Sequence, residues 1–288
     1  MCLHNHYFLW ISGTLCIFLL IFSPFMIYCE IVIGPPGSGK STYVQKKAED
    51  IKHRNPYLIN LDPGNIYTGL YDYNVSCTVK DYQIKNKMGP NGATKNILKD
   101  FVNNIEDFYY NFLENRENYL IIDLPGQVEF FITGDSLTRL IHFLTKKDIN
   151  VVIVNLIDLV FFNTSLLSSY LFTYISIFRM EVPFICVISK CDKYNMYDME
   201  YSLEDIASLK VLDLLKTNEK YEKMVSSFLS DYFVYNFHVL NYKDKNTTKL
   251  LQLNIDKSSG YFFSEEFEER ENYFKDLNPE NIFELYNK

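Results

Sequence analysis

The sequence predicts a three-layer α/β fold, in which helices cover both faces of a mainly parallel sheet and a helical insertion lies near residues 193–231. Two observations predict this fold. Short apolar segments alternate with helical patterns along the chain, which is typical of a sheet built from successive strand and helix units. One of these segments, VVIVNLI at 151–157, is apolar almost throughout, as expected of a strand buried on both faces of a parallel sheet.

The chain has 288 residues, of which 48% are hydrophobic, so it can bury a full-sized core within one domain. We predict that this domain occupies 26–263, between an apolar leader (1–25) and an acidic tail (264–288) that is a solvated helix or disordered. The predicted strands are 30–33, 57–60, 119–122, 151–156, 184–188 and 233–240. The predicted helices are 42–52, 93–115, 137–147, 165–179 and 247–253, with the polar stretch 193–231 forming the insertion.

The composition argues against several classes of function. The formal net charge of −8 offers no broad cationic surface, so no direct nucleic-acid partner is expected. The six cysteines include no CxxC pair, and His4 and His6 are the only histidines close together, so no metal-binding cluster is indicated. The thiols are expected to be reduced, which is typical of a cytoplasmic protein.

The leader allows two interpretations, because the run from Tyr7 to Tyr28 contains no Lys, Arg, Asp or Glu and is long enough to span a bilayer. A membrane helix ending near Tyr28 would leave no linker before a first strand at Glu30 to Ile33, and no cationic region precedes the apolar run. We therefore do not expect a membrane partner. We expect the leader to be dispensable or an artefact of the gene model, with Met26 as the functional start.

The segment GPPGSGKS at 34–41 fits the pattern GxxxxGK[ST], and it lies between an apolar strand and a helical pattern. In that context it predicts the phosphate-binding loop of a P-loop NTPase. Glycines let backbone N–H groups turn inward toward a β-phosphate, Lys40 supplies an ammonium group to the β and γ oxygens, and Ser41 offers its hydroxyl to Mg²⁺. The predicted nucleotide-binding residues of this loop are Gly34, Pro35, Pro36, Gly37, Ser38, Gly39, Lys40, Ser41 and Thr42.

A second segment, IIDLPGQVE at 121–129, places Asp123 at the end of an apolar strand. Beside a phosphate loop, Asp123 is expected to hold Mg²⁺ through water. Gln127 and Glu129 then become candidates for orienting the attacking water, because phosphoryl transfer depends mainly on positioning and charge compensation.

A third segment, SKCD at 189–192, is similar to the [NT]KxD motif that reads guanine, although Ser189 replaces the usual Asn. Asp192 can accept hydrogen bonds from guanine N1–H and N2–H₂ together, a pair of donors that adenine does not offer. Lys190 is predicted to lie along the base.

Two weaker signals complete the set. LDP at 61–63 follows the second predicted strand, so Asp62 can bind the Mg²⁺ shell or polarise water, although such a tripeptide is more often merely a turn. MGPNGA at 88–93 is, taken alone, best explained as a Pro-Asn-Gly turn that opens the helix predicted from Ala93.

Together, GPPGSGKSTY, NLDP, GPNG, DLPGQVE and SKCD, in this order and spacing, resemble the GPN-loop GTPases, a dimeric branch of the P-loop NTPases. The resemblance extends from about Met26 to Phe263. The chain most resembles the second eukaryotic paralogue of this family, judged by the PPG of the phosphate loop and by NIDKSSGYFF at 254–263.

The resemblance implies a Mg²⁺-dependent GTPase that binds GTP and GDP as a homodimer, or as a heterodimer with a paralogue. It also implies a role in assembly and nuclear import of RNA polymerase II, with polymerase III as a second candidate, in a cytoplasmic protein that shuttles to the nucleus. The residues it assigns to the partner's phosphates are Gly89, Pro90 and Asn91, and Asn241 belongs to the base-side loop. The implied catalytic set is Asp62, Asn91, Gln127 and Glu129, and the implied metal set is Ser41, Asp62 and Asp123.

The sequence departs from the family pattern between Gly64 and Lys87, where the usual acidic switch is absent and Ser76 stands near an expected Asp. Slow hydrolysis is therefore expected, and a nucleotide-dependent scaffold with little turnover is the main alternative. A membrane-anchored GTPase depends wholly on the apolar leader. An ATPase of the same branch is a further alternative, and Asp192 argues against it.

Overall fold

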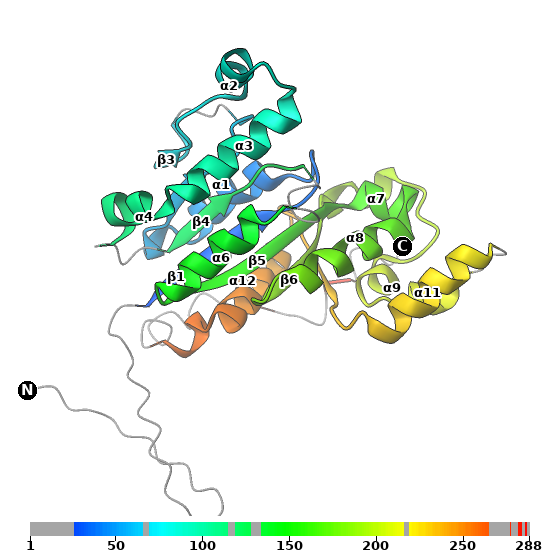
Figure 1. The fold of residues 1–288 in the computed structure, drawn as a ribbon. Coiled ribbons are helices and arrows are strands. Elements are labelled where there is room, and N and C mark those ends of the chain that lie inside the picture. The colour runs from blue at the N-terminus through cyan, green and yellow to red at the C-terminus, as the bar shows by residue number, and fades with distance from the viewer. Residues whose placement is uncertain are drawn as a thin grey trace, which may run out of the picture.

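The computed structural model describes residues 26–65, 69–114, 119–127, 134–215 and 219–264, together with 277, 282, 283 and 286. Its strands form a seven-stranded parallel sheet in the order β3-β2-β4-β1-β5-β6-β7 (Figure 1). The strands are β1 (Ile27–Ile33), β2 (Tyr57–Asn60), β3 (Tyr73–Asn74), β4 (Leu120–Asp123), β5 (Ile149–Asp158), β6 (Phe184–Ser189) and β7 (Phe237–Val239). The predicted P-loop NTPase fold is therefore confirmed.

The helices connect these strands and supply the two outer layers. The α-helices are α1 (Lys40–Asp50), α2 (Val79–Asn86), α3 (Pro90–Asn103), α4 (Ile105–Phe108), α6 (Ser136–Lys146), α7 (Leu159–Thr164), α8 (Leu166–Arg179), α9 (Leu203–Ala207), α10 (Val211–Leu214), α11 (Lys220–Tyr232) and α12 (Lys245–Ser259). Shorter turns of other helical types are η1 (Lys52–Arg54), η2 (Tyr109–Leu113), η3 (Cys191–Met196) and η4 (Tyr261–Phe263).

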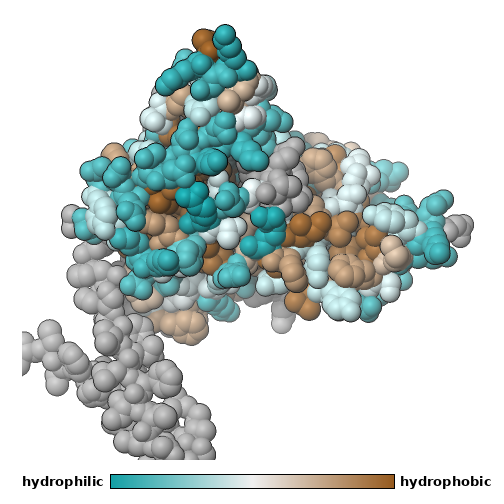
Figure 2. Space-filling view, viewed as in Figure 1, coloured by the Kyte–Doolittle hydropathy of each residue, from teal (hydrophilic) through white to brown (hydrophobic). Residues whose placement is uncertain are grey.

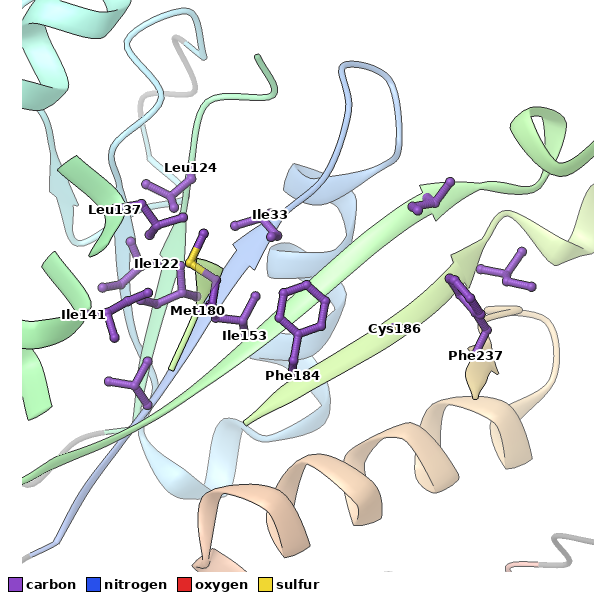
Figure 3. Packing of buried hydrophobic residues seen from close by; sticks show 14 of the residues in the cluster. Ile33, Ile122, Leu124, Leu137, Ile141, Ile153, Met180, Phe184, Cys186 and Phe237 are labelled. Carbon is purple, nitrogen blue, oxygen red and sulfur yellow. The ribbon is translucent and has the colours of Figure 1, made fainter. Parts of the chain in front are cut away.

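Side-chain alternation along the strands explains the three layers. Successive residues of a strand point to opposite faces, so Ile31 and Ile33 of β1 pack into one core with α3, α6 and α8. Val32 packs into the other core with α1 and α12, behind the sheet in Figure 1. Figure 3 shows the first core, where Ile122 of β4 and Leu124 lie near Leu137 of α6.

Several predicted boundaries were wrong. The strand predicted at 233–240 is confined to Phe237–Val239, because residues 233–236 form an irregular connection after helix α11. The helix predicted from Ala93 begins at Pro90, whose fixed φ suits the first helical position, and it breaks at Asn104 before a π-helical turn. Helices α2 and α7 and the short strand β3 were not predicted.

The helical insertion is present, and it differs in surface character from the opposite end of the molecule. Between 193 and 231 the chain forms part of η3, then α9, α10 and α11. Exposed apolar side chains lie here and on α8, including Phe178, Met224 and Phe228. In Figure 2 the lobe of α2 and α3 is mostly hydrophilic, whereas apolar residues gather on the side of α8, α9 and α11.

The structure adds detail at both ends of the predicted domain. Strand β1 begins at Ile27, so the last two residues of the apolar run that ends at Tyr28 belong to the central sheet. Residues 1–25 lie outside the described residues, and among the described helices none is long and apolar enough to cross a bilayer. The prediction of a solvated tail is contradicted at Ile282 and Tyr286, which are buried against the core.

Candidate functional site

The predicted motifs meet at one edge of the sheet. Parallel strands end at the same edge, and the loops that follow β1, β2, β4 and β6 carry the phosphate loop, LDP, DLPGQ and SKCD. Central strand β1 pairs with β4 on one side and with β5 on the other. The connection after β1 leads to β2 on one side of the sheet, whereas the connection after β4 leads to β5 on the other. Such a change of direction is the usual position of a ligand in an open α/β sheet.

The phosphate loop has the backbone that its glycines permit. Gly34, Gly37 and Gly39 have φ values of 144°, 77° and 92°, which residues with a Cβ atom rarely adopt. A Cβ atom at Gly34 would lie 2.1 Å from the carbonyl oxygen of Leu156 in β5, so only glycine fits there. Since proline has no N–H, Pro35 and Pro36 offer no backbone donor to a ligand, and the next N–H along the loop is that of Gly37.

Lys40 opens α1, and its ammonium group stays over the loop. Its Nζ donates to the carbonyl oxygens of Gly34 at 3.0 Å and Pro35 at 3.1 Å. Burial lowers the pKa of Lys40, while the nearby carboxylates of Asp123 and Asp62 act in the opposite direction. The loop is therefore ready to exchange these carbonyl contacts for phosphate oxygens.

Ser41 and Asp123 form the predicted metal pair. The Ser41 hydroxyl donates to Asp123 Oδ2 at 3.1 Å, across the gap between α1 and the end of β4. Asp123 is 1% exposed, and its other oxygen, Oδ1, is buried with no hydrogen-bond partner in the described part of the chain. An unsatisfied buried carboxylate oxygen beside a hydroxyl oxygen fits Mg²⁺, which prefers oxygen ligands and retains water.

Two residues that sequence analysis missed complete this pair. The Tyr71 hydroxyl donates to Asp123 Oδ2 at 2.6 Å. The Asn65 side-chain amide donates to Ser41 Oγ at 2.8 Å and lies 3.4 Å from Asp123 Oδ2. Burial raises the pKa of Asp123 to about 6, although the Tyr71 hydrogen bond and the Lys40 charge act to lower it. No local motif marks either residue.

Asp62 lies in the same electrostatic environment. Its Oδ1 accepts from the backbone N–H of Gly64 at 2.8 Å, which closes the turn that the LDP segment predicts. Burial raises the pKa of Asp62, whereas the charge of Lys40 lowers it. Asp62 therefore stands close enough to interact with both Lys40 and Asp123.

The GPN segment lies against the loop that follows β4. Gly89 caps α3, Pro90 begins it, and all three GPN residues are exposed. Gln127 Nε2 donates to Asn91 Oδ1 at 3.2 Å, so two predicted catalytic side chains touch within one chain. Glu129, the remaining predicted catalytic residue, lies outside the described residues.

The SKCD segment, which is predicted to bind the base, is hydrogen-bonded directly to the phosphate loop. Ser189, which replaces the expected Asn, donates its hydroxyl to the carbonyl oxygen of Ser38 at 2.7 Å. Lys190 donates to the carbonyl oxygen of Gly37 and, at 2.7 Å, to Asp158 Oδ2 at the end of β5. Asp158 was not predicted as a site residue. The same pattern that identified Asp123, an Asp at the end of a buried strand, could have identified it.

Asp192 and Asn241 come from adjacent loops. The backbone N–H of Cys191 donates to the carbonyl oxygen of Leu240 at 3.2 Å, which joins these loops. Asp192 keeps a carboxylate that is 30% exposed, with Lys243 at 3.9 Å. Asn241 Nδ2 instead donates to the hydroxyl of Tyr286 in the tail, at 2.9 Å.

Of the predicted loop residues, Ser38 is buried, and its hydroxyl has no hydrogen-bond partner within the ranges that the structure describes. Thr42 is exposed in the first turn of α1. The structure thus gathers Lys40, Ser41, Asp62 and Asp123 around one loop. Among described residues, no group of three or more His, Cys, Asp or Glu side chains could hold a metal ion alone, so a cation here would depend on a hydroxyl and a ligand.

Comparisons with known proteins identify the family to which the chain is related. A family model described as "Conserved hypothetical ATP binding protein" matches residues 32–261. GPN-loop GTPase 2 of Saccharomyces cerevisiae is 32% identical over 83% of this chain and 76% of its own length. GPN-loop GTPase 3 of Dictyostelium discoideum is 30% identical, over 81% of this chain and 87% of its own.

A solved structure gives the same fold. It is a GTPase from Pyrococcus abyssi in its apo form, with a TM-score of 0.61 over 81% of this chain and 97% of that chain. Its sequence identity of 19% supports the fold alone.

Proposed function

Because this chain belongs to the GPN-loop GTPase family, we propose that it binds GTP together with Mg²⁺ at the phosphate loop and hydrolyses it to GDP and phosphate. The observation that carries the proposal is the gathering of Lys40, Ser41 and Asp123 around a loop whose backbone requires glycine at Gly34. This loop follows the central strand and opens α1, so backbone N–H groups and the positive end of a helix dipole stabilise an anion there.

The residues have separate tasks. Lys40 offers its ammonium to the β and γ phosphates, in exchange for the carbonyl oxygens it now contacts. Ser41 and Asp123 would hold Mg²⁺, directly or through water, and the ion would supply charge neutralisation for the phosphates. We assign the orientation of the attacking water to Asp62 and Gln127, and the 3.2 Å hydrogen bond from Gln127 to Asn91 supports a role for Asn91 beside them.

A replacement of Lys40 tests nucleotide binding. We expect Lys40→Ala to abolish measurable affinity for a fluorescent GTP analogue, because no other described ammonium contacts the carbonyl oxygens of Gly34 and Pro35. Lys46→Ala is the matched control, since Lys46 lies on the same helix and forms an exposed salt bridge with Glu49. GTP affinity that is unchanged in Lys40→Ala would contradict the proposed site.

Base preference is a separate proposal, because the matching family model carries a description that names ATP. We propose guanine, since Asp192 keeps a partly exposed carboxylate at the loop pair that faces the base in related folds. Asp192→Asn exchanges one acceptor oxygen for a donor, so it should favour xanthosine over guanosine nucleotides. Competition among GTP, ATP and XTP measures this, and retained guanine preference in the variant would remove Asp192 from the site.

The dimer and the cellular role are proposed from the family resemblance. We propose a homodimer, or a heterodimer with a paralogue, in which the exposed segment Gly89 to Asn91 reaches the partner's phosphates. Light scattering with and without a non-hydrolysable GTP analogue tests the dimer. We further propose a cytoplasmic protein that shuttles to the nucleus and assists assembly and import of RNA polymerase II, with polymerase III as a second candidate client. Affinity capture of polymerase subunits from the organism's own extract tests that role.

A nucleotide-dependent scaffold is the second candidate. The observation that favours it is Ser76, which is exposed two residues after β3, near the position where the family pattern has an Asp. Phosphate release by the purified protein with GTP and Mg²⁺ separates the two candidates. Turnover supports the GTPase, whereas tight GTP binding without phosphate release supports the scaffold.

A further inference from the structure

We propose that Tyr71 is a positioning residue of the metal site, which together with Asn65 holds the Asp123 carboxylate and the Ser41 hydroxyl so that one acceptor of each stays free for a divalent cation. The inference rests on the proposed function, because it concerns the cation that accompanies the nucleotide. The supporting observation is the arrangement of hydrogen bonds around the Asp123 carboxylate and the Ser41 hydroxyl.

The two carboxylate oxygens of Asp123 have opposite environments. An ionised carboxylate offers about four acceptor positions. Oδ2 accepts from Ser41 at 3.1 Å, from Tyr71 at 2.6 Å and, at the limit of a hydrogen bond, from Asn65 at 3.4 Å. Oδ1 is buried and accepts from none of the described residues. The donors therefore occupy one oxygen and leave the other for a cation or its bound water.

The Ser41 hydroxyl is oriented by the same group. A hydroxyl has one proton and two lone pairs. Its proton is directed to Asp123 Oδ2, and one lone pair accepts from the Asn65 amide at 2.8 Å. One lone pair is then left for a metal. Without Asn65, the hydroxyl could rotate and direct its proton toward the cation, which would weaken coordination.

Tyr71 reaches Asp123 from a segment that is fixed to the sheet. The ring is 7% exposed and packs in the core with α1 and α12. The next residue, Asp72, donates its N–H to the carbonyl oxygen of Leu58 at 3.0 Å, and its carboxylate accepts from the N–H of Leu58 at 2.8 Å. This double contact fixes the segment to β2. The 2.6 Å bond to Asp123 is the length expected when a hydroxyl donates to a charged oxygen.

A purely structural tyrosine is the competing explanation, since a buried phenol needs an acceptor wherever it lies. The two explanations differ in what the hydroxyl changes. A structural hydroxyl contributes only to stability, whereas a positioning hydroxyl also sets the affinity of the site for a cation. Partners that orient metal ligands typically change metal affinity 10- to 100-fold when they are removed.

The test is a Mn²⁺ titration of the full-length GDP complex, followed by electron paramagnetic resonance of the free ion. We expect Tyr71→Phe and Asn65→Ala each to bind Mn²⁺ about 10- to 100-fold more weakly than the unaltered protein. Tyr73→Phe is the matched control, because its ring packs against Phe108 and Phe112 and not against the metal pair. GDP affinity in EDTA shows that each variant keeps its fold.

The possible results test the role of Tyr71 separately from the proposed function. Unchanged Mn²⁺ affinity in Tyr71→Phe, with Asp123→Ala strongly impaired, would overturn the positioning role and leave the proposed function intact. An unaltered protein that binds neither GDP nor Mn²⁺ would overturn the proposed function and this inference with it. If Tyr71→Phe does not fold, Asn65→Ala still tests whether this group of donors sets the cation affinity, and unchanged Mn²⁺ affinity in that variant would overturn the proposal that Tyr71 and Asn65 together hold the metal pair.

Discussion

A buried ion pair at the amino-terminal edge of the sheet allows a quantitative prediction of stability. Arg54 in η1 donates to the two carboxylate oxygens of Asp256 in α12 at 2.6 and 2.7 Å. The two side chains are 4% and 0% exposed. Gln252 donates to the same carboxylate at 2.7 Å, and the ring of Tyr261 lies 4.0 Å from the Arg54 guanidinium. The pair joins α12 to the segment between α1 and β2.

We expect Asp256→Asn to destabilise the domain strongly. The Asp256 carboxylate accepts three hydrogen bonds, and an Asn has only one acceptor oxygen, so its NH₂ group must face a donor in either orientation. The Arg54 charge would also lose its counter-charge in a buried position. Removing one partner of a buried pair costs about 3–5 kcal/mol. At about 2–4 °C per kcal/mol for a domain of this size, the melting temperature should fall by about 6–20 °C.

Thermal unfolding followed by circular dichroism measures this shift. Glu49→Gln is the control, because the Lys46 and Glu49 side chains are 48% and 58% exposed and such surface pairs contribute at most about 1 kcal/mol. The double variant Arg54→Met with Asp256→Leu should recover much of the loss, since it removes both charges. An Asp256→Asn protein that melts within a few degrees of Glu49→Gln would refute the reasoning.

Two further predictions concern the phosphate loop and the sheet edge. Gly34→Ala should unfold at a lower urea concentration than Gly37→Ala, because a Cβ atom at Gly34 would lie 2.1 Å from the Leu156 carbonyl oxygen. A Cβ atom at Gly37, where φ is 77°, would have no atom within 4 Å, so Gly37→Ala should cost only the penalty of about 1–2 kcal/mol for a left-handed backbone. Equal urea midpoints for the two variants would contradict the clash. His238 has its pKa lowered by burial from 6.5 to about 4, so its neutral form stabilises the fold above pH 6.5, and this contribution is lost as the pH falls toward 4. His238→Gln should therefore lose less unfolding free energy than the unaltered protein between pH 7 and pH 4.5, and parallel curves would show that His238 does not contribute.

Local signals predicted most of the sheet and the phosphate loop. Six of the seven strands follow from apolar runs, because a strand buried on both faces must be apolar along its length. Helix α2 was missed for the opposite reason, since none of its residues is buried and its sequence has no apolar period to detect. Burial at two tail positions was not predicted, because the composition of the tail is polar, whereas the side chains of Ile282 and Tyr286 pack against the core.

The site was predicted where a motif is continuous in sequence and missed where the partners are distant. Lys40 and Ser41 lie in one loop, so their pattern suffices to identify them. Tyr71 contacts Asp123 from 52 residues away. Its role depends on the pairing of β2 with β3 and β4, which no spacing rule reveals. Ser189 was interpreted as a weakness of the SKCD motif, yet its hydroxyl bonds to the phosphate loop, a role that a short polar side chain can fill.

The two strands beside β1 suggest a way to find such residues from sequence. β4 ends in Asp123 and β5 ends in Asp158, so a carboxylate lies on each side of the phosphate loop. Uncompensated, each would repel a bound triphosphate. Asp158 is neutralised by Lys190 at 2.7 Å, whereas Asp123 receives hydrogen bonds and keeps one oxygen unpaired among described residues. An Asp that ends a strand beside a phosphate loop therefore requires a nearby cation. For Asp158 this cation is the Lys190 ammonium, which belongs to the loop predicted to bind the base. Asp123 accepts its hydrogen bonds from neutral side chains, which indicates that its cation is the metal ion.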